Sequence, residues 1–507
     1  MPATDLISPF VVSCAGGLTL NKDVFSMQPG EALILQNFEP DIKGGYRRVS
    51  GTALYNTTQI PQGSSNSSLV VDCSIIFNGQ VIVARGGDIH RGTTSGSFTT
   101  LTTGLGTSTR AYDFEKFNFN GTDKLIIATG HSPAQIINTS FAVDVVNATG
   151  GGTAPSNPKF VKAFQNHMFY AGATNSQEVI FSVPFEEDNF TSASGAGSFK
   201  VDSTVVGMKV FRNELIIFCQ DRIYKLTGTS SSNFAVQEVT RNIGCRDGGS
   251  IQEIGGDVIF LAPDGLRTIA GTARIGDVEL GSISRQIQSR IDEVTLDRIT
   301  SMVIRDKSQY RLFYTNTSLE NSQQKGIIGT LRPDGFQWSE TRGLEVTSIG
   351  SGFDSNNVEQ YYHGDTNGFV YQHDIGNNFD GSNILARFET PNYDYGDLGT
   401  LKTLHYVRVS ASSEGITEPN IQVRFDYGNT DIPQPPELFD LGVINPPSKF
   451  GDALFNTNVF GGGDNPLIRV PLQGSGTSNN FTIISDDTKP PYTINGFYVD
   501  YIPSGRR

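Results

Sequence analysis

Short apolar runs of four or five residues recur along the chain, and most of them follow a turn-forming pair of residues. These pairs stand about 40–50 residues apart, beginning with Asn78-Gly79 and Asn120-Gly121. Runs of this length are too short for helices and are typical of strands that are buried on both faces. The runs are VIVA (81–84), LIIA (125–128), MFYA (168–171), LIIF (215–218), VIFL (258–261) and YRLFY (310–314).

A second turn and strand often follow each run, as in QDRIYKL (220–226), PDGLRTI (263–269) and DTNGFVY (365–371). Each unit is therefore expected to be a small antiparallel meander that cannot bury its own faces alone. Repeated meanders of this length predict a β-propeller of about six or seven blades between Leu69 and His373. A stack of sandwiches and a β-solenoid are the alternatives, although solenoid coils are generally shorter than this period.

The pattern changes after about Leu385, where apolar and polar positions alternate along longer strands. Alternation of this kind gives each sheet one covered and one solvated face, which is typical of a β-sandwich. The chain is therefore expected to be all-β. Its expected domains are an extended N-terminal arm (1–52), a β-propeller (53–380) and a C-terminal β-sandwich (385–507).

One helix is expected to interrupt the strands, in the segment SISRQIQSRIDEVTLDRI (282–299). Ile283, Ile287, Ile291 and Val294 recur at helical spacing and would share one apolar face. We expect this face to pack on the rim of the propeller. Contact with a neighbouring subunit is the alternative.

Composition agrees with short strands and tight turns. The 507 residues include 56 glycines, and glycine accepts the positive φ that hairpin turns need. The formal net charge of −14 disfavours a nucleic-acid-binding surface, although a weakly repulsive wall would let a polyanion slide past. No segment approaches the apolar length that spans a bilayer, so no membrane insertion is expected.

No pattern of residues predicts a catalytic, cofactor-binding or metal site. The stretch GHSPA (130–134) resembles a nucleophile elbow by letter, but an elbow leads into a helix and the residues after Ser132 continue extended. The six histidines show no H-E-x-x-H spacing and the four cysteines form no C-x-x-C pair. The chain is therefore not expected to be an enzyme.

The segment NFEPDIKGGYRRVSGT (37–52) combines aromatic, basic and acidic side chains ahead of the first blade. Aromatic and arginine side chains are typical anchors of protein interfaces. Two interpretations stay open, an arm that closes the propeller by pairing with a later blade and a contact with another subunit. The residues expected to dock on a partner or subunit are Phe38, Asp41, Tyr46, Arg47 and Arg48.

The leader AGGLTLNKDVFSMQPGEALILQNFEPDIKGGYRRVSGT (15–52) resembles the start of many tailed-phage virion proteins, with its GG opening, PGEA stretch, N-x-E-P step and GGYRR sequence. Residues 205–269, with a Y-x-L-T-G step, are similar to the propeller of the tail hub, or nozzle, of short-tailed bacteriophages. The SISRQIQSRIDEV segment and the RLFYT strand also look like this family. The resemblance covers most of residues 15–380.

This resemblance implies a structural protein of the virion, located in the phage tail, that forms a homo-oligomeric ring, usually of six subunits. The ring would lie below the portal and adaptor rings and would dock tail fibres, spikes or a plug. Genomic DNA would pass through its lumen without sequence-specific binding.

Two alternatives from other classes stay open. A glycan-binding or glycan-hydrolysing propeller would gather carboxylates and aromatic side chains at the propeller centre. A secreted adhesion or scaffold propeller would be a monomer with glycans or a signal peptide.

Overall fold

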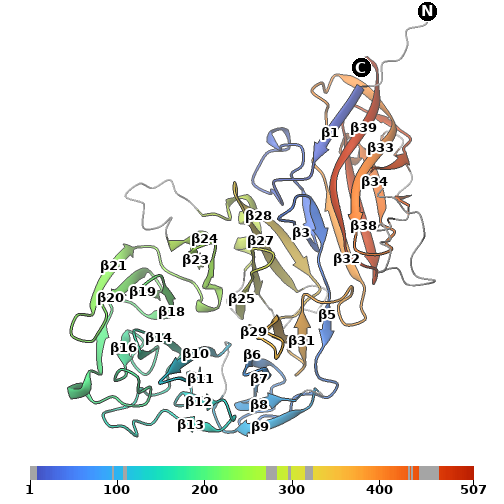
Figure 1. The fold of residues 1–507 in the computed structure, drawn as a ribbon. Coiled ribbons are helices and arrows are strands. Elements are labelled where there is room, and N and C mark those ends of the chain that lie inside the picture. Colours follow the sequence, from blue (N-terminus) through green and yellow to red (C-terminus); the bar gives the residue numbers. More distant parts are fainter. Residues whose placement is uncertain are drawn as a thin grey trace, which may run out of the picture.

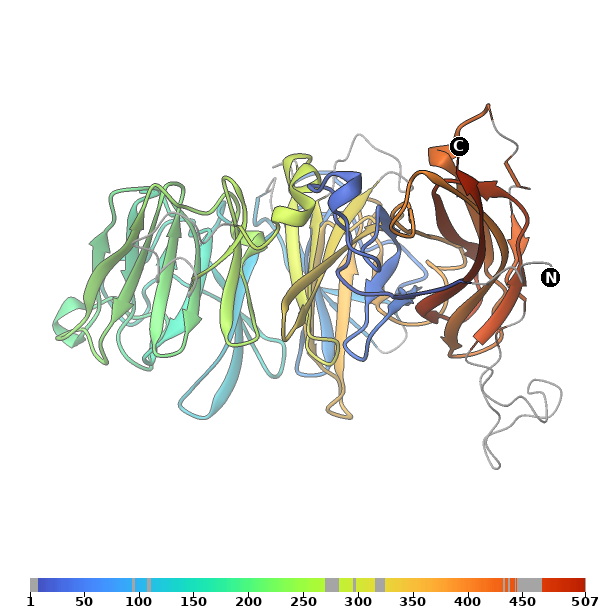
Figure 2. The same cartoon turned by 90° about the horizontal axis from the view of Figure 1, so that it is seen from above.

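The computed structural model describes residues 8–93, 96–106, 111–269, 282–294, 298–314, 324–431, 434–435, 438–442, 444 and 467–506. A propeller and a β-sandwich lie side by side, as Figures 1 and 2 show. The expected all-β propeller with a C-terminal sandwich and an extended N-terminal segment is confirmed.

The propeller consists of seven blades in chain order around the ring: five separate four-stranded sheets, one sheet of three described strands, and four strands of a sheet that continues into the sandwich. The first three blades are β6 (Val71–Phe77), β7 (Gln80–Arg85), β8 (Asp88–Gly92) and β9 (Phe98–Thr102); β10 (Asp113–Phe119), β11 (Thr122–Ala128), β12 (Gln135–Asn138) and β13 (Val143–Val145); and β14 (Phe160–Phe164), β15 (His167–Ala171), β16 (Glu178–Phe181) and β17 (Gly197–Lys200).

The next three blades are β18 (Val205–Phe211), β19 (Glu214–Cys219), β20 (Arg222–Thr227) and β21 (Ala235–Arg241); β22 (Gln252–Ile254), β23 (Asp257–Ala262) and β24 (Gly265–Thr268); and β25 (Ile299–Ile304), β26 (Gln309–Tyr314), β27 (Lys325–Arg332) and β28 (Gly335–Arg342). The last blade contains β29 (Ser348–Phe353), β30 (Glu359–Gly364), β31 (Val370–His373) and the early strand β5 (Thr52–Leu54).

The predicted apolar runs are the second strands of their blades, and they are almost entirely buried. The hairpin before β7 turns at Asn78 and Gly79, with φ of 46° and 71°. A type I′ turn requires positive φ at both positions, which Asn and Gly tolerate. Two expected turns lie one residue earlier than predicted, at 165–166 and 212–213.

A separate apolar cluster lies between each pair of neighbouring blades, and seven such clusters complete the ring. The last cluster joins Val71 and Val83 of the first blade to Val370 of the final one. Strand β5 pairs with β31, so that Thr52 faces His373. The final blade is therefore completed by residues that precede the first blade.

The sandwich has two sheets. One contains β1 (Ser8–Ser13), β3 (Phe38–Pro40), β4 (Tyr46–Arg48), β33 (Thr400–Ser413), β36 (Leu467–Pro471), β37 (Ser475–Gly476) and β39 (Tyr492–Arg506). The other contains β32 (Ile384–Glu389), β34 (Asn420–Phe425), β35 (Phe439–Asp440) and β38 (Asn479–Asp487). Their alternating apolar side chains meet in one cluster between the sheets.

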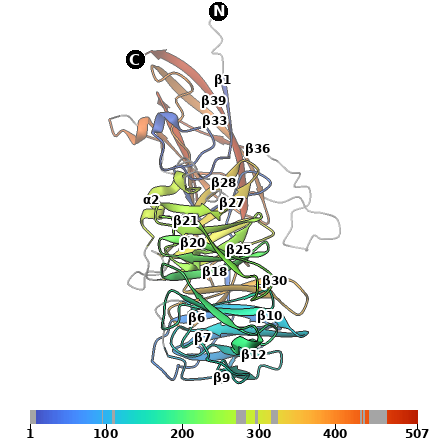
Figure 3. The ribbon, with the colours of Figure 1, turned by 90° about the vertical axis from the view of Figure 1, so that its left-hand side faces the viewer.

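Strand β2 (Ile34–Gln36) joins the two domains through the backbone. It pairs parallel with β28 of the propeller and antiparallel with β32 of the sandwich. One sheet of nine strands therefore runs from a propeller blade into the sandwich, and Figure 3 shows the two parts from the side. The N-terminal segment is extended, and its strands lie within the sheets of the sandwich.

The expected helix at 282–299 is much shorter than predicted. A 3₁₀ turn, η4 (Arg285–Ile287), continues into α2 (Gln288–Asp292), and residues 295–297 lie outside the described ranges. The apolar face is as predicted, because Ile287, Ile291 and Val294 are buried in the shared core. The other 3₁₀ turns are η1 (Val24–Ser26), η2 (Ser192–Ser194), η3 (Gly248–Ser250) and η6 (Asp426–Gly428). Among the described helices, none is long and apolar enough to cross a membrane.

Candidate functional site

The GG, PGEA and GGYRR elements of the leader meet in one hydrogen-bonded contact. The Tyr46 hydroxyl donates to the carbonyl of Gly30 at 2.5 Å and accepts from the N–H of Gly17 at 2.9 Å. Gly17 has φ of 72°, and a Cβ there would lie 2.7 Å from the backbone nitrogen of Trp338. The N–H of Leu18 donates to the Trp338 carbonyl at 2.7 Å. The GG, PGEA and GGYRR elements therefore hold the segment against β28.

Substituting Tyr46→Phe is expected to lower the free energy of unfolding by about 1–3 kcal/mol, because it leaves the buried N–H of Gly17 without its acceptor, while the carbonyl of Gly30 keeps only the N–H of Ala15 at 3.2 Å. Urea unfolding followed by fluorescence measures the change. Tyr427→Phe is the control, since Tyr427 is 55% exposed and its change should stay near zero. Equal effects of both variants would contradict the role of this contact.

Three of the five predicted docking residues are buried within the chain. Phe38, Tyr46 and Arg48 are each 0% exposed. Phe38 packs edge-on against Tyr492, with ring centroids 5.7 Å apart. Arg48 donates to the carbonyl of Asp487 at 2.6 Å. The docking prediction is corrected for these three side chains, because contacts inside the sandwich make them inaccessible to a partner.

Asp41 and Arg47 lie closer to the surface. Arg47 forms ion pairs with Glu39 at 2.9 Å and with the exposed Glu414 at 2.6 Å. A carboxylate oxygen of Asp41 accepts from the N–H of Lys43 at 2.8 Å in the turn between β3 and β4. Docking on another protein stays a prediction for these two residues alone.

A buried ionic network lies where the N-terminal segment meets the last two blades, and we call it the seam network. Glu39 of β3 is 1% exposed and lies 2.7 Å from Arg311, 3.0 Å from Lys307 and 2.9 Å from Arg47. Asp374 lies 3.0 Å from Arg311 and 2.8 Å from Lys307. Burial alone would raise the pKa of Glu39, but Lys307 and Arg311 outweigh burial and hold it below its ordinary value.

Two buried histidines extend the seam network into the last blade. Arg311 lies 3.0 Å from Nε2 of His373, and Nδ1 of His373 lies 3.3 Å from Nδ1 of His363. Arginine can only donate, so Nε2 of His373 accepts, its Nδ1 carries the proton, and His363 is protonated on Nε2. Burial lowers the pKa of His363 to about 3 and that of His373 well below its ordinary value. Both rings are therefore neutral at physiological pH.

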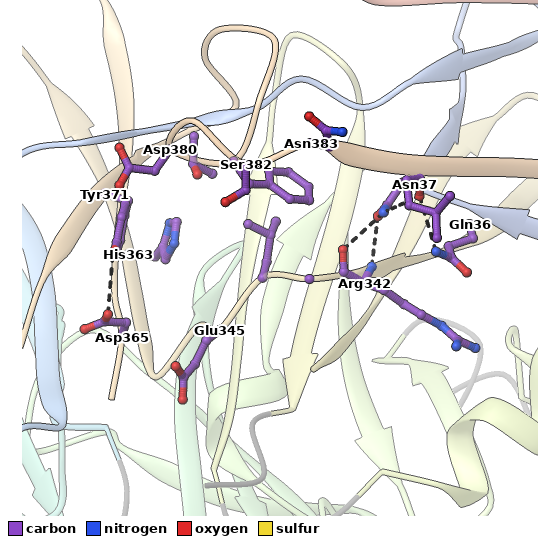
Figure 4. A pocket seen from close by; sticks show the side chains of 15 residues that line it. Gln36, Asn37, Arg342, Glu345, His363, Asp365, Tyr371, Asp380, Ser382 and Asn383 are labelled. Atoms are coloured by element: carbon purple, nitrogen blue, oxygen red, sulfur yellow. Dashed lines mark hydrogen bonds between the residues drawn. The ribbon is translucent and has the colours of Figure 1, made fainter. Parts of the chain in front are cut away.

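A pocket of about 480 Å³ lies beside this network, between the last blade, the N-terminal segment and the linker to the sandwich. We call it the seam pocket. Figure 4 shows His363, Tyr371 and Asp365 at one side and Arg342 at the other. The His363 ring stacks on Tyr371 with centroids 5.3 Å apart. Apolar side chains complete the wall, namely Leu344, Phe379 and Leu385.

The carboxylates of the seam pocket are poorly solvated. Glu345 and Asp365 are 7% and 3% exposed. Glu345 accepts from the Thr366 hydroxyl, and Asp365 accepts from the N–H of Phe369 at 2.8 Å. Burial raises the pKa of both carboxyls. The pocket thus presents strong hydrogen-bond acceptors in a partly apolar cavity.

The centre of the propeller holds two cavities of about 250 and 700 Å³, with charged side chains between them. Lys162 lies 2.9 Å from Asp113 and 3.4 Å from Glu115. Arg298 lies 2.8 Å from Asp72, and both side chains are buried. These carboxylates are engaged by cations, whereas glycoside hydrolysis needs a free acid and base flanking the sugar.

The serine, histidine and cysteine residues considered as catalytic or metal-binding candidates in the sequence form no reactive arrangement among the described residues. The Ser132 hydroxyl lies 3.0 Å from that of Thr129 and 3.3 Å from the carbonyl of Pro133, and β12 follows in place of a helix. No group of three or more His, Cys, Asp and Glu in the described ranges could hold a metal ion. The four cysteines are buried free thiols.

No family model matches the chain, and no curated protein matches it. Among solved structures, the extracellular domain of a putative hybrid two-component system from B. thetaiotaomicron is 11% identical with a TM-score of 0.40, covering 64% of this chain and 39% of that one. The designed protein Ika8 is 11% identical with a TM-score of 0.35, covering 62% and 99%. The WD40 repeats of RRP9 are 8% identical with a TM-score of 0.38, covering 64% and 99%. These similarities assign no function.

Proposed function

We propose that this protein is a structural subunit of a phage tail, a tail hub or nozzle protein that assembles into a ring of about six copies. The observation that carries the proposal is the position of the leader (15–52) in the fold. The letters on which the resemblance rests fasten the N-terminal segment between the propeller and the sandwich. A wall element of a conduit needs this kind of rigid coupling between domains.

The charge distribution supports the same role. The net charge of −14 repels a polyanion, so DNA moving through a lumen made of such subunits would not adhere to the wall. Ion pairs occupy the centre of the propeller. The lumen would therefore lie between subunits, with each propeller acting as one piece of its wall.

Exposed apolar side chains provide candidate surfaces for the neighbouring subunits, adaptor, fibres, spikes or plug. Phe353 and Val358 flank the turn of the β29–β30 hairpin and are each 52% exposed. Phe185, in the loop between β16 and β17, is 46% exposed. Apolar side chains exposed on a fold contribute to protein contact surfaces where they form a contiguous patch.

The mass of the native particle tests this proposal. Native mass spectrometry of the purified chain, with and without phage adaptor rings, is expected to show a ring near six copies or a monomer that becomes a ring on the adaptor. The double variant Asp41→Ala, Arg47→Ala should weaken that assembly while the monomer stays folded. A persistent monomer that ignores adaptor rings would contradict the proposal and favour a glycan-binding propeller or a scaffold propeller.

A further inference from the structure

The seam pocket has on its wall a histidine N–H that meets no acceptor among the described residues. His363 is 2% exposed and its Nδ1 is occupied by His373. The proton on Nε2 meets no hydrogen-bond acceptor among the described residues, and the ring lines the pocket. Nε2 therefore carries a donor proton at the pocket wall, where the acceptor of a ligand can receive it.

Acceptors surround this donor. The carboxylates of Glu345 and Asp365 lie in the same pocket, and that of Asp380 stands at its exposed side. Each ionised carboxylate accepts several hydrogen bonds and donates none. A ligand must therefore donate to these oxygens and also accept from His363, which a hydroxyl group does and an ammonium or guanidinium group does not.

The remaining wall suits a ring with one apolar face. Phe379 and Leu344 are buried and line the cavity, and the Tyr371 ring stands beside His363. The volume of about 480 Å³ falls within the roughly 300–1,000 Å³ of small-molecule sites. The C–H face of a sugar ring would pack on these side chains while its hydroxyls reach the polar ones.

We propose that the seam pocket binds a neutral sugar unit, with Glu345 and Asp365 accepting from its hydroxyls and His363 donating to one of them. This site is distinct from the propeller centre, and it does not depend on the tail-hub proposal.

Saturation-transfer NMR with the methyl glycosides of glucose, galactose, mannose and N-acetylglucosamine tests the site at millimolar concentration. At least one glycoside is expected to bind the full chain, and it should shift the His363 Nε2–H resonance of ¹⁵N-histidine-labelled protein. Glu345→Gln is expected to weaken binding by about 10–100-fold. Asp123→Asn, an exposed acid on a distant blade, is the control and should bind normally.

Ser382→Trp gives a second variant that does not disturb the core, since Ser382 is an exposed residue of the pocket wall. The indole should fill the cavity and abolish binding while unfolding stays unchanged. Absence of binding by all four glycosides would overturn the proposal, as would unaltered binding to Ser382→Trp. Stronger binding of methylguanidinium than of any glycoside would also overturn it. Native mass spectrometry of Glu345→Gln separates the two proposals, because the ring should form normally.

Discussion

Replacing Glu39 with alanine is expected to lower the free energy of unfolding by about 3–5 kcal/mol. The carboxylate lies within 3.0 Å of both Lys307 and Arg311. The Arg311 side chain is 3% exposed, so water cannot solvate the charge that the substitution leaves behind. Asp374 would remain as the single carboxylate beside the buried Arg311 and the partly exposed Lys307. Breaking a buried ion pair from one side costs more than the pair itself contributes.

Chemical unfolding in urea measures this loss. Glu414→Ala is the matched control, because Glu414 also pairs with Arg47 but its side chain is 56% exposed; its removal should change the unfolding free energy by less than about 1 kcal/mol. A loss of similar size in both variants would show that the seam network contributes no more than a surface ion pair.

Acidification below about pH 6.5 is expected to destabilise the protein by about 1.4 kcal/mol per pH unit for each buried neutral histidine. The ordinary pKa of His363 is 6.5 and burial lowers it to about 3 in the folded chain. Above pH 6.5 neither state binds the proton, so stability does not change. Between the two values the unfolded state binds the proton and the folded state does not, so stability falls as the pH falls.

His373 adds a second proton with the same sign, because its pKa is also lowered by burial, with His363 and Arg311 acting in the same direction. The two histidines together should give a slope of about 3 kcal/mol per pH unit. Lower in pH, Glu39 and Asp374 reinforce the loss, because their pKa values are depressed in the folded chain and their protonation weakens the seam network.

Urea unfolding at a series of pH values tests this dependence. The double variant His363→Gln, His373→Gln should reduce the slope below pH 6.5 by about 3 kcal/mol per pH unit, since glutamine can still accept from Arg311. His90 and His167, whose pKa values burial also lowers, should keep a remaining slope. His405→Gln is the control, because His405 is exposed, and its slope should equal that of the unaltered chain. An unchanged slope in the double variant would assign the acid sensitivity to other groups. His90, whose pKa burial lowers to about 4, would then be the next residue to replace.

The sequence by itself determined the strands and the repeating unit of this protein. Turn pairs such as Asn78-Gly79 predict the position of a hairpin to within a few residues. The apolar run that follows predicts a strand that is buried on both faces. Both signals are local, so they could be read without knowing where the blades meet. Alternation after Leu385 likewise recorded one covered face in β33 and β34, whereas β38 is buried on both faces over most of its length.

Only the tertiary structure decided which residues of the N-terminal segment are accessible. Residues 37–52 have the amino-acid composition of a protein interface. Aromatic and arginine side chains that are buried inside a domain give the same composition, so the sequence does not distinguish the two cases. The segment was expected to dock through Phe38, Tyr46 and Arg48, whereas the sandwich encloses all three.

The seam network and the seam pocket could not be predicted from the sequence either. Glu39 and Arg311 are 272 positions apart, and no local pattern brings two such residues together. The one available signal was the acid of the N-x-E-P step, an unpaired charge between apolar neighbours. The cations that pair with Glu39 are identified only by the tertiary structure, in which β2 and β3 lie beside the last two blades. Burial and ion pairing depend on contacts between distant parts of the chain.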